Sequence, residues 1–379
     1  MQKEYINKIR EYVGDMSQVA GIKSYTLLDG KSNGVRAVDF WTGSGLNFTV
    51  ILDRCMDISQ ATYKGRSLCW RSPAKEVHPH FYEPQGFGWV KGFFGGLVTT
   101  CGLTHLGAAC IDQEEHLGLH GRVSYIPAED IRMRQEWEDT EYVLSVEGRI
   151  RQVSVFGENL ILTRKITAWL GRSEIKIEDK VENVGYKDTP FMMLYHINTG
   201  FPIVTPESRF VSTSQKIAPR DDEAKEGIEN FDKFTEPSKV YKEKVYYHDM
   251  KEDDNGLVRC AVISEQKEEE PFGLSLVYTK KELPQFVQWK MLENQNYALG
   301  IEPSNCWTEG RDKEREWGAL DYVKPGEERT FSLKFGILSG RTDIDSFTQD
   351  IQNVVEKKST DIISREDMIS IKKKQFKRD

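Results

Sequence analysis

Two runs of sequence decide the fold class: "LILTRKITAWL" at residues 160–170 and "EIKIEDKVENVG" at residues 174–185. Both are rich in Ile, Val and Thr, and a short glycine-containing stretch separates them. Comparable runs occur as "VRAVDFWTG" (35–43), "LNFTVILD" (46–53) and "YVLSVEGRI" (142–150). Strand-like runs spaced by about 8 to 12 residues, with no helical patterns of about 10 to 15 residues between them, are typical of an antiparallel sheet. The sequence therefore predicts a large all-β sandwich and disfavours a doubly wound parallel sheet.

Length and composition limit the class of protein and its partners. The 379 residues carry a net charge of -8, and 38% of them are hydrophobic, which gives no reason to expect nucleic acid as a partner. No apolar stretch approaches the roughly 20 residues that span a bilayer, and the N-terminus lacks the apolar core of a signal peptide. We therefore expect no membrane partner and a cytoplasmic location.

The six cysteines are scattered without a C-x-x-C pair, so free thiols are expected. The sequence does not indicate how many subunits assemble.

The ends of the chain differ in character from the strand-rich middle. Residues 1–20 predict a short N-terminal amphipathic helix, and apolar residues at helical spacing behind Asp and Ser caps predict helices after residue 340. We therefore expect one sandwich domain over residues 1–340 and a helical extension over 341–379. Within the sandwich, residues 72–96 combine prolines, glycines and aromatics, which predicts a long ordered loop over the sheet. The charged segment 220–244 predicts a surface excursion and is the strongest candidate for a mobile piece.

Five of the seven histidines fall between residues 78 and 120, which raises the possibility of a metal site. In "HLGLH", His116 and His120 are four residues apart, and His105 could supply a third ligand, leaving a position open for water. However, that spacing aligns two ligands only on a helix, and the two glycines of "EEHLGLHGR" oppose one. Acid-base work on a neutral polar substrate is the alternative, because histidine titrates near neutrality and a partly buried glutamate can accept a proton.

Three segments end an apolar run on polar side chains that are followed by Gly or Pro. They are "GLHGRVSYIPAE" with His120 and Arg122, "FMMLYHINTGFPI" with His196 and Asn198, and "ALGIEPSNCW" with Glu302 and Asn305. Such side chains emerge where a sheet ends and can face a ligand in a concave surface. A nucleophile elbow, a phosphate loop and a dinucleotide fingerprint are all missing from the sequence.

The motifs "LHGR", "YHINTGFP" and "ALGIEPSN", in this order on an all-β chain, resemble the galactose mutarotase (aldose 1-epimerase) superfamily. The resemblance covers about residues 13–340 and is greatest to a bacterial branch of aldose 1-epimerase-like proteins. It implies a large β-sandwich with a carbohydrate site in its concave face. It also implies that Glu302 is the general base, that His196 is the general acid and that His120 helps to bind a small-molecule sugar. Ring opening of a hemiacetal needs one acid and one base, so no cofactor is expected.

The chain departs from the familiar mutarotases at several substrate-binding positions. Where they carry an Asn-Arg pair, this sequence reads "VTTCGLTHLG", so His105 and Thr104 could replace an arginine in the sugar site. Lys290 in "VQWKML" could replace the substrate-binding aspartate, and Arg71 in "WRSP" is either a sugar contact or part of a buried ion pair. Two alternatives to anomer interconversion remain open: isomerisation or epimerisation next to a carbonyl, with or without a metal, and sugar binding without turnover.

Overall fold

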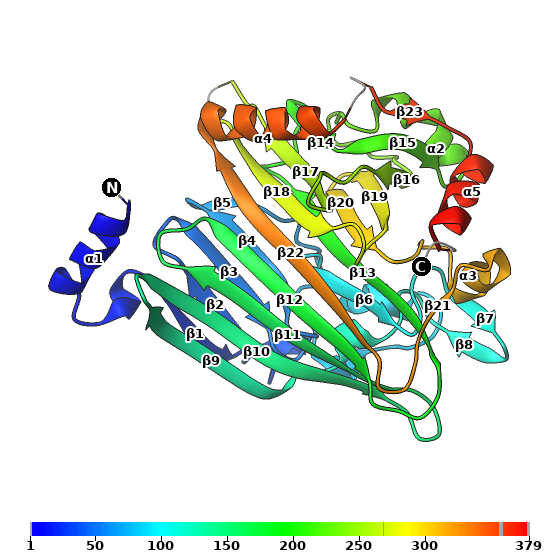
Figure 1. The fold of residues 1–379 in the computed structure, drawn as a ribbon, viewed down its shortest axis with the longest axis horizontal. Helices are drawn as coiled ribbons and strands as arrows, with labels where there is room; N and C mark the ends of the chain where they lie inside the picture. Colours follow the sequence, from blue (N-terminus) through cyan, green and yellow to red (C-terminus); the bar gives the residue numbers. More distant parts are fainter. Residues whose placement is uncertain (1, 268, 356–358, 377–379) are drawn as a thin grey trace.

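The computed structural model describes residues 2–267, 269–355 and 359–376, and it is built mainly of antiparallel strands (Figure 1). Three large sheets carry the fold. The first has the strand order β1-β2-β3-β4-β5. Its strands are β1 (Gly21–Thr26), β2 (Arg36–Trp41), β3 (Leu46–Ile51), β4 (Asp57–Tyr63) and β5 (Arg66–Ser67).

The second sheet has eight strands in the order β14-β17-β18-β22-β12-β11-β10-β9 and runs across the middle of Figure 1. Its strands are β14 (Ser208–Ser212), β17 (Leu257–Ser264), β18 (Phe272–Thr279), β22 (Glu328–Ser339), β12 (Glu174–Asn183), β11 (Asn159–Trp169), β10 (Glu141–Val153) and β9 (Glu129–Glu138). The two runs that decide the fold class form the hairpin β11–β12. Every second residue of β12 is buried, as expected for a strand with one face on the core.

The third sheet carries the candidate site and has the order β21-β13-β20-β19-β16-β15-β23, with β6 also paired to β13. Its strands are β21 (Asp321–Val323), β13 (Thr189–Gly200), β20 (Tyr297–Ser304), β19 (Gln285–Leu292), β16 (Lys244–Met250), β15 (Ser214–Pro219), β23 (Asp361–Ile362) and β6 (Thr99–Leu103). A two-stranded hairpin lies outside these sheets and consists of β7 (Cys110–Asp112) and β8 (Glu115–Leu117).

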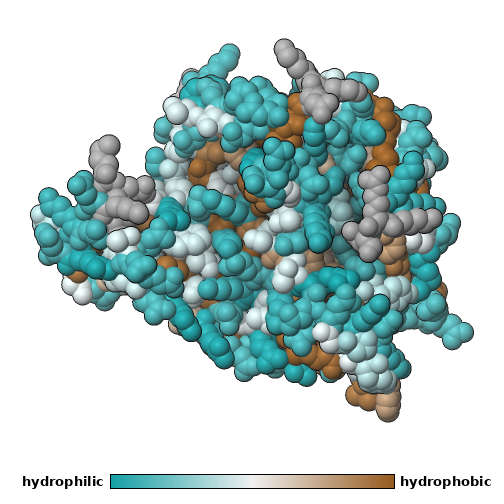
Figure 2. Space-filling model, viewed as in Figure 1, coloured by the Kyte–Doolittle hydropathy of each residue, from teal (hydrophilic) through white to brown (hydrophobic). Residues whose placement is uncertain are grey.

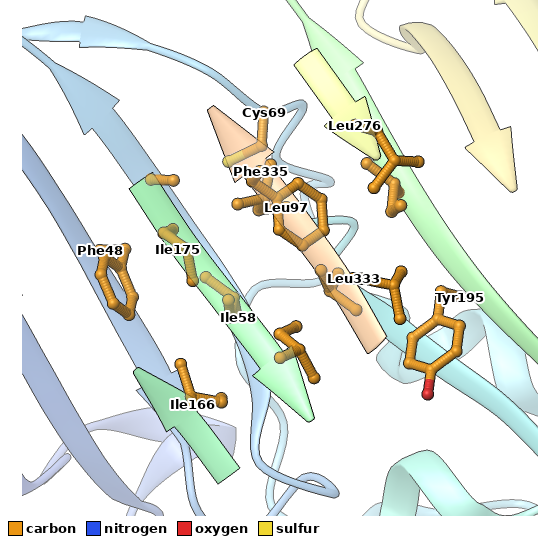
Figure 3. Packing of buried hydrophobic residues seen from close by; sticks show 14 of the residues in the cluster. Phe48, Ile58, Cys69, Leu97, Ile166, Ile175, Tyr195, Leu276, Leu333 and Phe335 are labelled. Carbon is orange, nitrogen blue, oxygen red and sulfur yellow. The ribbon is translucent and has the colours of Figure 1, made fainter. Parts of the chain in front are cut away.

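The main hydrophobic core lies between the sheets and draws on all three of them. In Figure 3, Phe48 comes from the first sheet, Leu333 from the second and Tyr195 from the third. A buried ionic network crosses the same core. Arg164 pairs with Asp57 at 2.9 Å and with Asp179 at 2.6 Å, and Tyr195 Oη donates to Asp179 at 2.7 Å. The predicted all-β sandwich is therefore confirmed.

Helices lie at the ends of the chain, as the sequence predicts. They are α1 (Gln2–Tyr12) near the N-terminus and α4 (Gly340–Val354) and α5 (Arg365–Phe376) after the last long strand. The short helices α2 (Asp222–Glu226) and α3 (Arg311–Trp317) lie between strands. Residues 340–354 pack against β22 and β18, while β23 adds to the edge of the third sheet beside β15. The C-terminal segment therefore contacts two of the sheets.

The two irregular segments both contact the third sheet. Residues 72–96 contain only short 3-10 helices and no named strand, and Trp89, Phe93 and Phe94 within them are buried, which matches the predicted ordered loop. Residues 220–244 form α2 and a 3-10 turn, and Phe231 O accepts a 2.7 Å hydrogen bond from Gln288 on β19. This segment is therefore bound to the sheet rather than being a purely solvated excursion.

The face seen in Figure 2 is mostly hydrophilic, with small scattered apolar patches, as the negative net charge suggests. Among the helices of the described ranges, none is long and apolar enough to cross a membrane.

Candidate functional site

The cross-strand register of the third sheet brings His196 and Glu302 together. Strands β13 and β20 are antiparallel, and the pairs Leu194↔Ser304 and Asn198↔Gly300 flank the two residues symmetrically. His196 on β13 therefore lies directly opposite Glu302 on β20, with both side chains on the same face of the sheet. The distance from His196 Nδ1 to Glu302 Oε1 is 3.3 Å. Two residues that are about a hundred positions apart in the sequence thus form one pair.

A missing side chain at Gly300 makes room for the carboxylate of Glu302. A Cβ atom placed on Gly300 would lie 2.3 Å from Glu302 Oε1 and 3.0 Å from the Cβ of Trp289. Gly300 pairs with Asn198 on β13 and with Trp289 on β19, so the carboxylate leans over the strand position between Asn198 and this indole. Any larger residue at 300 would force the carboxylate to move.

Aromatic rings surround the pair. The ring of His196 lies 5.2 Å from Phe93, 5.8 Å from His120 and 5.5 Å from Trp289, measured between ring centroids. Trp89 packs against His120 at 4.8 Å. Phe93 and Trp89 come from the loop 72–96, so this loop forms one wall of the site and β19 forms another. Aromatic faces of this kind suit contact with the apolar face of a sugar.

Arg54 holds this wall in place. Its guanidinium is fully buried and donates to three backbone carbonyl groups, those of Ser124, Val77 and Gly92, at 2.5 to 3.0 Å. Val77 and Gly92 belong to the loop 72–96, and Ser124 follows the His120 turn. One buried cation therefore links the segments that carry Trp89, Phe93 and His120.

His120 occupies a left-handed backbone conformation, with φ of 56°, which is uncommon for a residue other than glycine. Its N–H donates to Gly107 O at 2.8 Å, and its carbonyl accepts from Gly102 N at 3.2 Å. Its Nδ1 is buried and makes no hydrogen bond within the described part of the chain. Backbone strain of this kind is often found at functional sites, and the His120 ring lies 5.8 Å from the ring of His196.

Burial controls the proton affinities of the pair. Only 2% of the Glu302 side chain and 8% of the His196 side chain is exposed. Burial raises the pKa of Glu302 well above its usual value, with the carboxylate of Glu243 acting in the same direction and Arg220 opposing it. Burial lowers the pKa of His196 to about 4, against a smaller opposite effect of Asn198. Burial also lowers the pKa of His120, as do the neighbouring imidazoles. The surroundings thus favour the neutral form of each group.

The pair is also unusual because neither contacting atom has a hydrogen-bond partner. His196 Nδ1 and Glu302 Oε1 are both buried without one, considering all residues that the structure describes. Buried polar atoms in native proteins are normally hydrogen-bonded, so each exception calls for an explanation such as a ligand. The arrangement offers one proton acceptor and one proton donor within reach of the same small molecule.

The two predicted ligand residues Asn198 and Asn305 differ in what their side chains contact. Asn198 lies on the same face as His196, where its Nδ2 donates to His196 O at 2.9 Å and its Oδ1 is buried without a partner in the described chain. Asn305 binds the backbone of β13 instead, accepting from Met193 N at 2.7 Å and donating to Phe191 O at 3.1 Å. The structure therefore gathers Asn198 with the pair, whereas Asn305 joins two strands.

The predicted arginines and lysine make contacts away from the pair. Arg122 donates to Val153 O at 3.0 Å and pairs with Glu158. Arg71 pairs with Glu76 at 2.6 Å, which agrees with the ion-pair alternative for this residue rather than with a sugar contact.

Lys290 alternates with Trp289 and lies on the opposite face of β19. Its Nζ donates to Asn230 O at 2.7 Å and to Lys233 O, and burial lowers its pKa to about 8. The strand alternation therefore separates Lys290 from Glu302.

The three histidines of the alternative metal site are not gathered as ligands. His105 is buried, and burial together with the nearby Arg311 lowers its pKa to about 4. His116 is exposed on β8, where it lines a separate cavity of about 500 Å³ beside Cys110 and Gln85. Across the described ranges, no three His, Cys, Asp or Glu side chains form a group that could hold a metal ion.

Two charged residues near the pair, Arg220 and Glu243, are absent from the sequence-based set. They lie near the two ends of the segment 220–244, which the sequence predicts to be a surface excursion. The pairing of β15 with β16 brings them to the face that carries Glu302. The alternation in "VQWKML" is the one local signal, since it places Trp289 and Lys290 on opposite faces, but the register of β19 cannot be read from the sequence.

A family model described as a domain of unknown function, DUF4432, matches residues 32–337, which is most of the chain. The chain belongs to the DUF4432 family. The matched range contains every residue of the site described above, so this DUF4432 member carries His120, His196 and Glu302 within its family domain. No curated protein matches the chain.

Solved structures show which fold this DUF4432 chain has. A Klebsiella pneumoniae protein provisionally assigned as an aldose 1-epimerase matches with a TM-score of 0.86 at 22% identity, covering 94% of this chain and 93% of that one. A galactose mutarotase-like protein from Clostridium acetobutylicum gives 0.58 at 12% identity, with coverage of 85% and 99%. A galactose 1-epimerase from Lactobacillus acidophilus gives 0.54 at 10% identity, with coverage of 85% and 100%. The fold is therefore galactose mutarotase-like, and the predicted resemblance is confirmed at the level of the fold.

Proposed function

We propose that this protein interconverts the anomers of a sugar by general acid-base catalysis at His196 and Glu302. The observation that carries the proposal is the cross-strand contact of 3.3 Å between a buried imidazole and a buried carboxylate, whose contacting atoms, His196 Nδ1 and Glu302 Oε1, have no hydrogen-bond partner among the described residues. The galactose mutarotase-like fold and the aromatic surroundings of the pair agree with a sugar as the ligand.

The chemistry requires two proton transfers. Glu302, as the carboxylate, removes the proton from the anomeric hydroxyl while the bond between C1 and the ring oxygen breaks, so that C1 becomes a free carbonyl. His196, as the imidazolium, gives its proton to the ring oxygen. After rotation about the C1–C2 bond, the same transfers in reverse close the ring to the other anomer. The protein is unchanged at the end, and neither a redox step nor a group transfer occurs.

The burial of the pair favours the half of the cycle that opens the ring and opposes the half that closes it. Ring opening converts a carboxylate and an imidazolium into a carboxylic acid and a neutral imidazole. Burial raises the pKa of Glu302 and lowers the pKa of His196, so the desolvated surroundings stabilise the neutral pair over the charged pair. The electrostatics of the site therefore favour the ring-opened state of the cycle, and they make the charged pair that starts ring opening the minor form of the free site. General acid-base catalysis of this kind contributes about a hundredfold to ten thousandfold.

His120 and Asn198 are the further ligand contacts in this proposal. Each has a buried polar atom without a partner in the described chain, His120 Nδ1 and Asn198 Oδ1, and each lies beside His196. Sugar hydroxyl groups can both donate and accept, so they can satisfy either atom.

The experiment is a screen of aldoses, ketoses and uronic acids by saturation-transfer NMR between the anomer signals. The proposal expects faster exchange for at least one sugar with the wild-type protein, without added metal. Binding without faster exchange would contradict the proposal and favour a sugar-binding module. Conversion of one sugar into another would favour an isomerase that acts next to the carbonyl.

A further inference from the structure

A row of side chains crosses the third sheet next to the row that contains His196 and Glu302. Pairing across the strands aligns Asn198, Gly300, Trp289, Val245 and Arg220. Arg220 follows β15, and its N–H donates to Val245 O at 2.9 Å, which continues the ladder beyond the last residue of that strand. Directly paired residues share a face, so Arg220 projects from the same face as Trp289 and Glu302.

Hydrogen bonds connect the far end of this row to the acid-base pair. Arg220 Nη2 donates to Glu243 Oε1 at 2.8 Å, and Trp289 Nε1 donates to Glu243 Oε2 at 3.0 Å. Trp289 in turn meets His196 edge to face, with ring centroids 5.5 Å apart and planes at 71°. Each oxygen of one carboxylate therefore has a different partner, and the indole is held by its single N–H donor.

We propose that Arg220 and Glu243 are positioning residues for the acid-base pair: Glu243 fixes the indole of Trp289 against His196, and Arg220 holds Glu243 in place. The proposal rests on the proposed function, because it assigns these residues a role in that reaction. The indole is half-buried, and a side chain in this state would sample other rotamers without the bond to Glu243. Fixing it keeps the wall of the ligand site close to the carboxylate of Glu302.

The same two residues oppose each other electrostatically at Glu302. The carboxylate of Glu243 raises the pKa of Glu302, whereas the guanidinium of Arg220 lowers it. The other titratable groups that face Glu302 are His196 on β13 and the buried thiol of Cys101 on β6. Removing one member of the Arg220–Glu243 pair should therefore move the titration of Glu302 in one direction, and removing the other should move it in the opposite direction.

Three variants separate the mechanical and the electrostatic effects. Glu243→Gln keeps an acceptor for the indole N–H but removes the charge. Glu243→Ala removes both, and Arg220→Gln removes the cation. Two exposed neighbours give matched controls for the same changes of charge, Glu229→Gln and Lys242→Gln.

The position of Trp289 is read from its indole ¹⁵N–¹H signal in tryptophan-labelled protein, assigned with Trp289→Phe among the eight tryptophans. The titration of Glu302 is read from ¹³C-labelled glutamate carboxyl signals, assigned with Glu302→Gln, and from the acidic limb of the kcat/KM profile. Glu243→Ala should shift the indole signal and raise KM about 3-fold to 10-fold, the size of one lost aromatic contact. Glu243→Gln should leave the indole signal nearly in place and move the Glu302 titration to lower pH. Arg220→Gln should move that titration to higher pH.

The two levels of the proposal fail in different ways. If no sugar shows faster exchange, the proposed function fails. The indole signal of Trp289 and the carboxyl titration of Glu302 still test the positioning role. An indole signal that does not move in Glu243→Ala would overturn the inference, as would Glu302 titrations in Glu243→Gln and Arg220→Gln that match the controls. If the indole signal and the Glu302 titrations shift as expected but KM does not change, the role in ligand binding is likewise overturned.

Discussion

Two buried polar clusters lie on opposite faces of strand β13, and they begin at consecutive residues. Tyr195 faces the core, where its hydroxyl donates to Asp179 at 2.7 Å. His196 faces the opposite side, on which Phe93 of the loop 72–96 packs, and meets Glu302 at 3.3 Å. Both clusters are almost completely removed from solvent and both contain carboxylates. They differ in whether their polar atoms are satisfied.

In the core cluster, charges and hydrogen bonds match. Arg164 binds Asp57, Asp179 and Cys55 O, while Asp57 also accepts from the backbone and the hydroxyl of Thr100. In the cluster around His196, atoms of His196, Glu302, Asn198 and His120 have no partner among the described residues. Burial alone therefore does not distinguish a structural cluster from a functional one. Between these two clusters the unsatisfied atoms make the difference, because they remain available to a ligand.

The largest effect on activity is expected for Glu302→Gln, which tests whether the cluster around His196 is functional rather than structural. We expect kcat/KM for anomer exchange to fall about a hundredfold to ten thousandfold, since the amide cannot act as the base. We expect the free energy of unfolding to stay the same or to rise, because the change removes a buried ionisable group whose Oε1 has no hydrogen-bond partner in the described chain. Exchange NMR and urea unfolding of the same preparation measure both quantities. A marked loss of stability with retained activity would place Glu302 in the structural class.

The matching change in the core is Arg164→Met, for which we expect the reverse pattern. Removing this cation leaves Asp57 and Asp179 buried without a counter-charge, which costs about 3 to 5 kcal/mol of unfolding free energy. Urea unfolding at neutral pH checks the value, with Arg172→Met as a control. Arg172 pairs with Glu141 near the surface, so its loss should cost at most about 1 kcal/mol. Equal effects of the two changes would refute the importance of the core network.

Gly300→Ala probes the space that the carboxylate of Glu302 requires. The new methyl group would lie 2.3 Å from Glu302 Oε1 and must displace it, so we expect kcat/KM to fall about 10-fold to 100-fold. Gly336→Ala on β22 is the control, because the methyl group there would meet only the hydroxyl of Ser275. Steady-state kinetics with both variants test the point, and unchanged activity in Gly300→Ala would show that the carboxylate is not held where we describe it.

The pH dependence of stability tests a buried histidine whose two nitrogens are satisfied. His248 contacts Ser214 Oγ at 2.9 Å and Gln288 Oε1 at 3.0 Å, and burial lowers its pKa from 6.5 to about 4. Between these values the unfolded chain binds a proton that the folded chain does not, so stability is full above pH 6.5 and falls as the pH drops toward 4. The histidine accounts for about 3 kcal/mol of this loss. Urea unfolding from pH 7 to pH 4 should show a shallower decline for His248→Gln, and parallel curves would contradict the assignment.

The smallest expected effect is that of Arg122→Ala. Arg122 binds Val153 O and Glu158 rather than the acid-base pair, so we expect kcat/KM to change less than about 3-fold. Steady-state kinetics with the responsive sugar provide the measurement. A fall in kcat/KM of more than tenfold would show that Arg122 acts in the ligand site and would contradict its assignment to a structural role.

The strands and the central pair could be predicted because their signals are local. Short runs such as "EIKIEDKVENVG" alternate with the period of a strand, and the polar ends of the β13 and β20 runs contain His196 and Glu302. The shared motifs then assigned roles to these two residues. The loop 72–96 was also predictable, since its prolines and glycines exclude a regular strand.

The register between distant strands could not be predicted, and the remaining errors follow from it. The position of Lys290 on the strand before Glu302 predicts a ligand contact, yet the pairing of Val287 with Glu302 puts Lys290 on the other face. Arg220 and Glu243 have no local signal for the same reason, because only the pairing of β15 and β16 brings them near Trp289. A one-residue slip of any strand would exchange the two faces, and local sequence does not exclude it.

A double-mutant cycle on anomer exchange tests the central claim most directly. The cycle compares kcat/KM of the wild-type protein with that of Glu302→Gln, His196→Gln and the double variant. If the two residues transfer protons within one reaction, the double variant should lose little more than the worse single variant, because residues that act as a unit are strongly non-additive. Losses that simply multiply, or an unchanged rate in either single variant, would contradict the account.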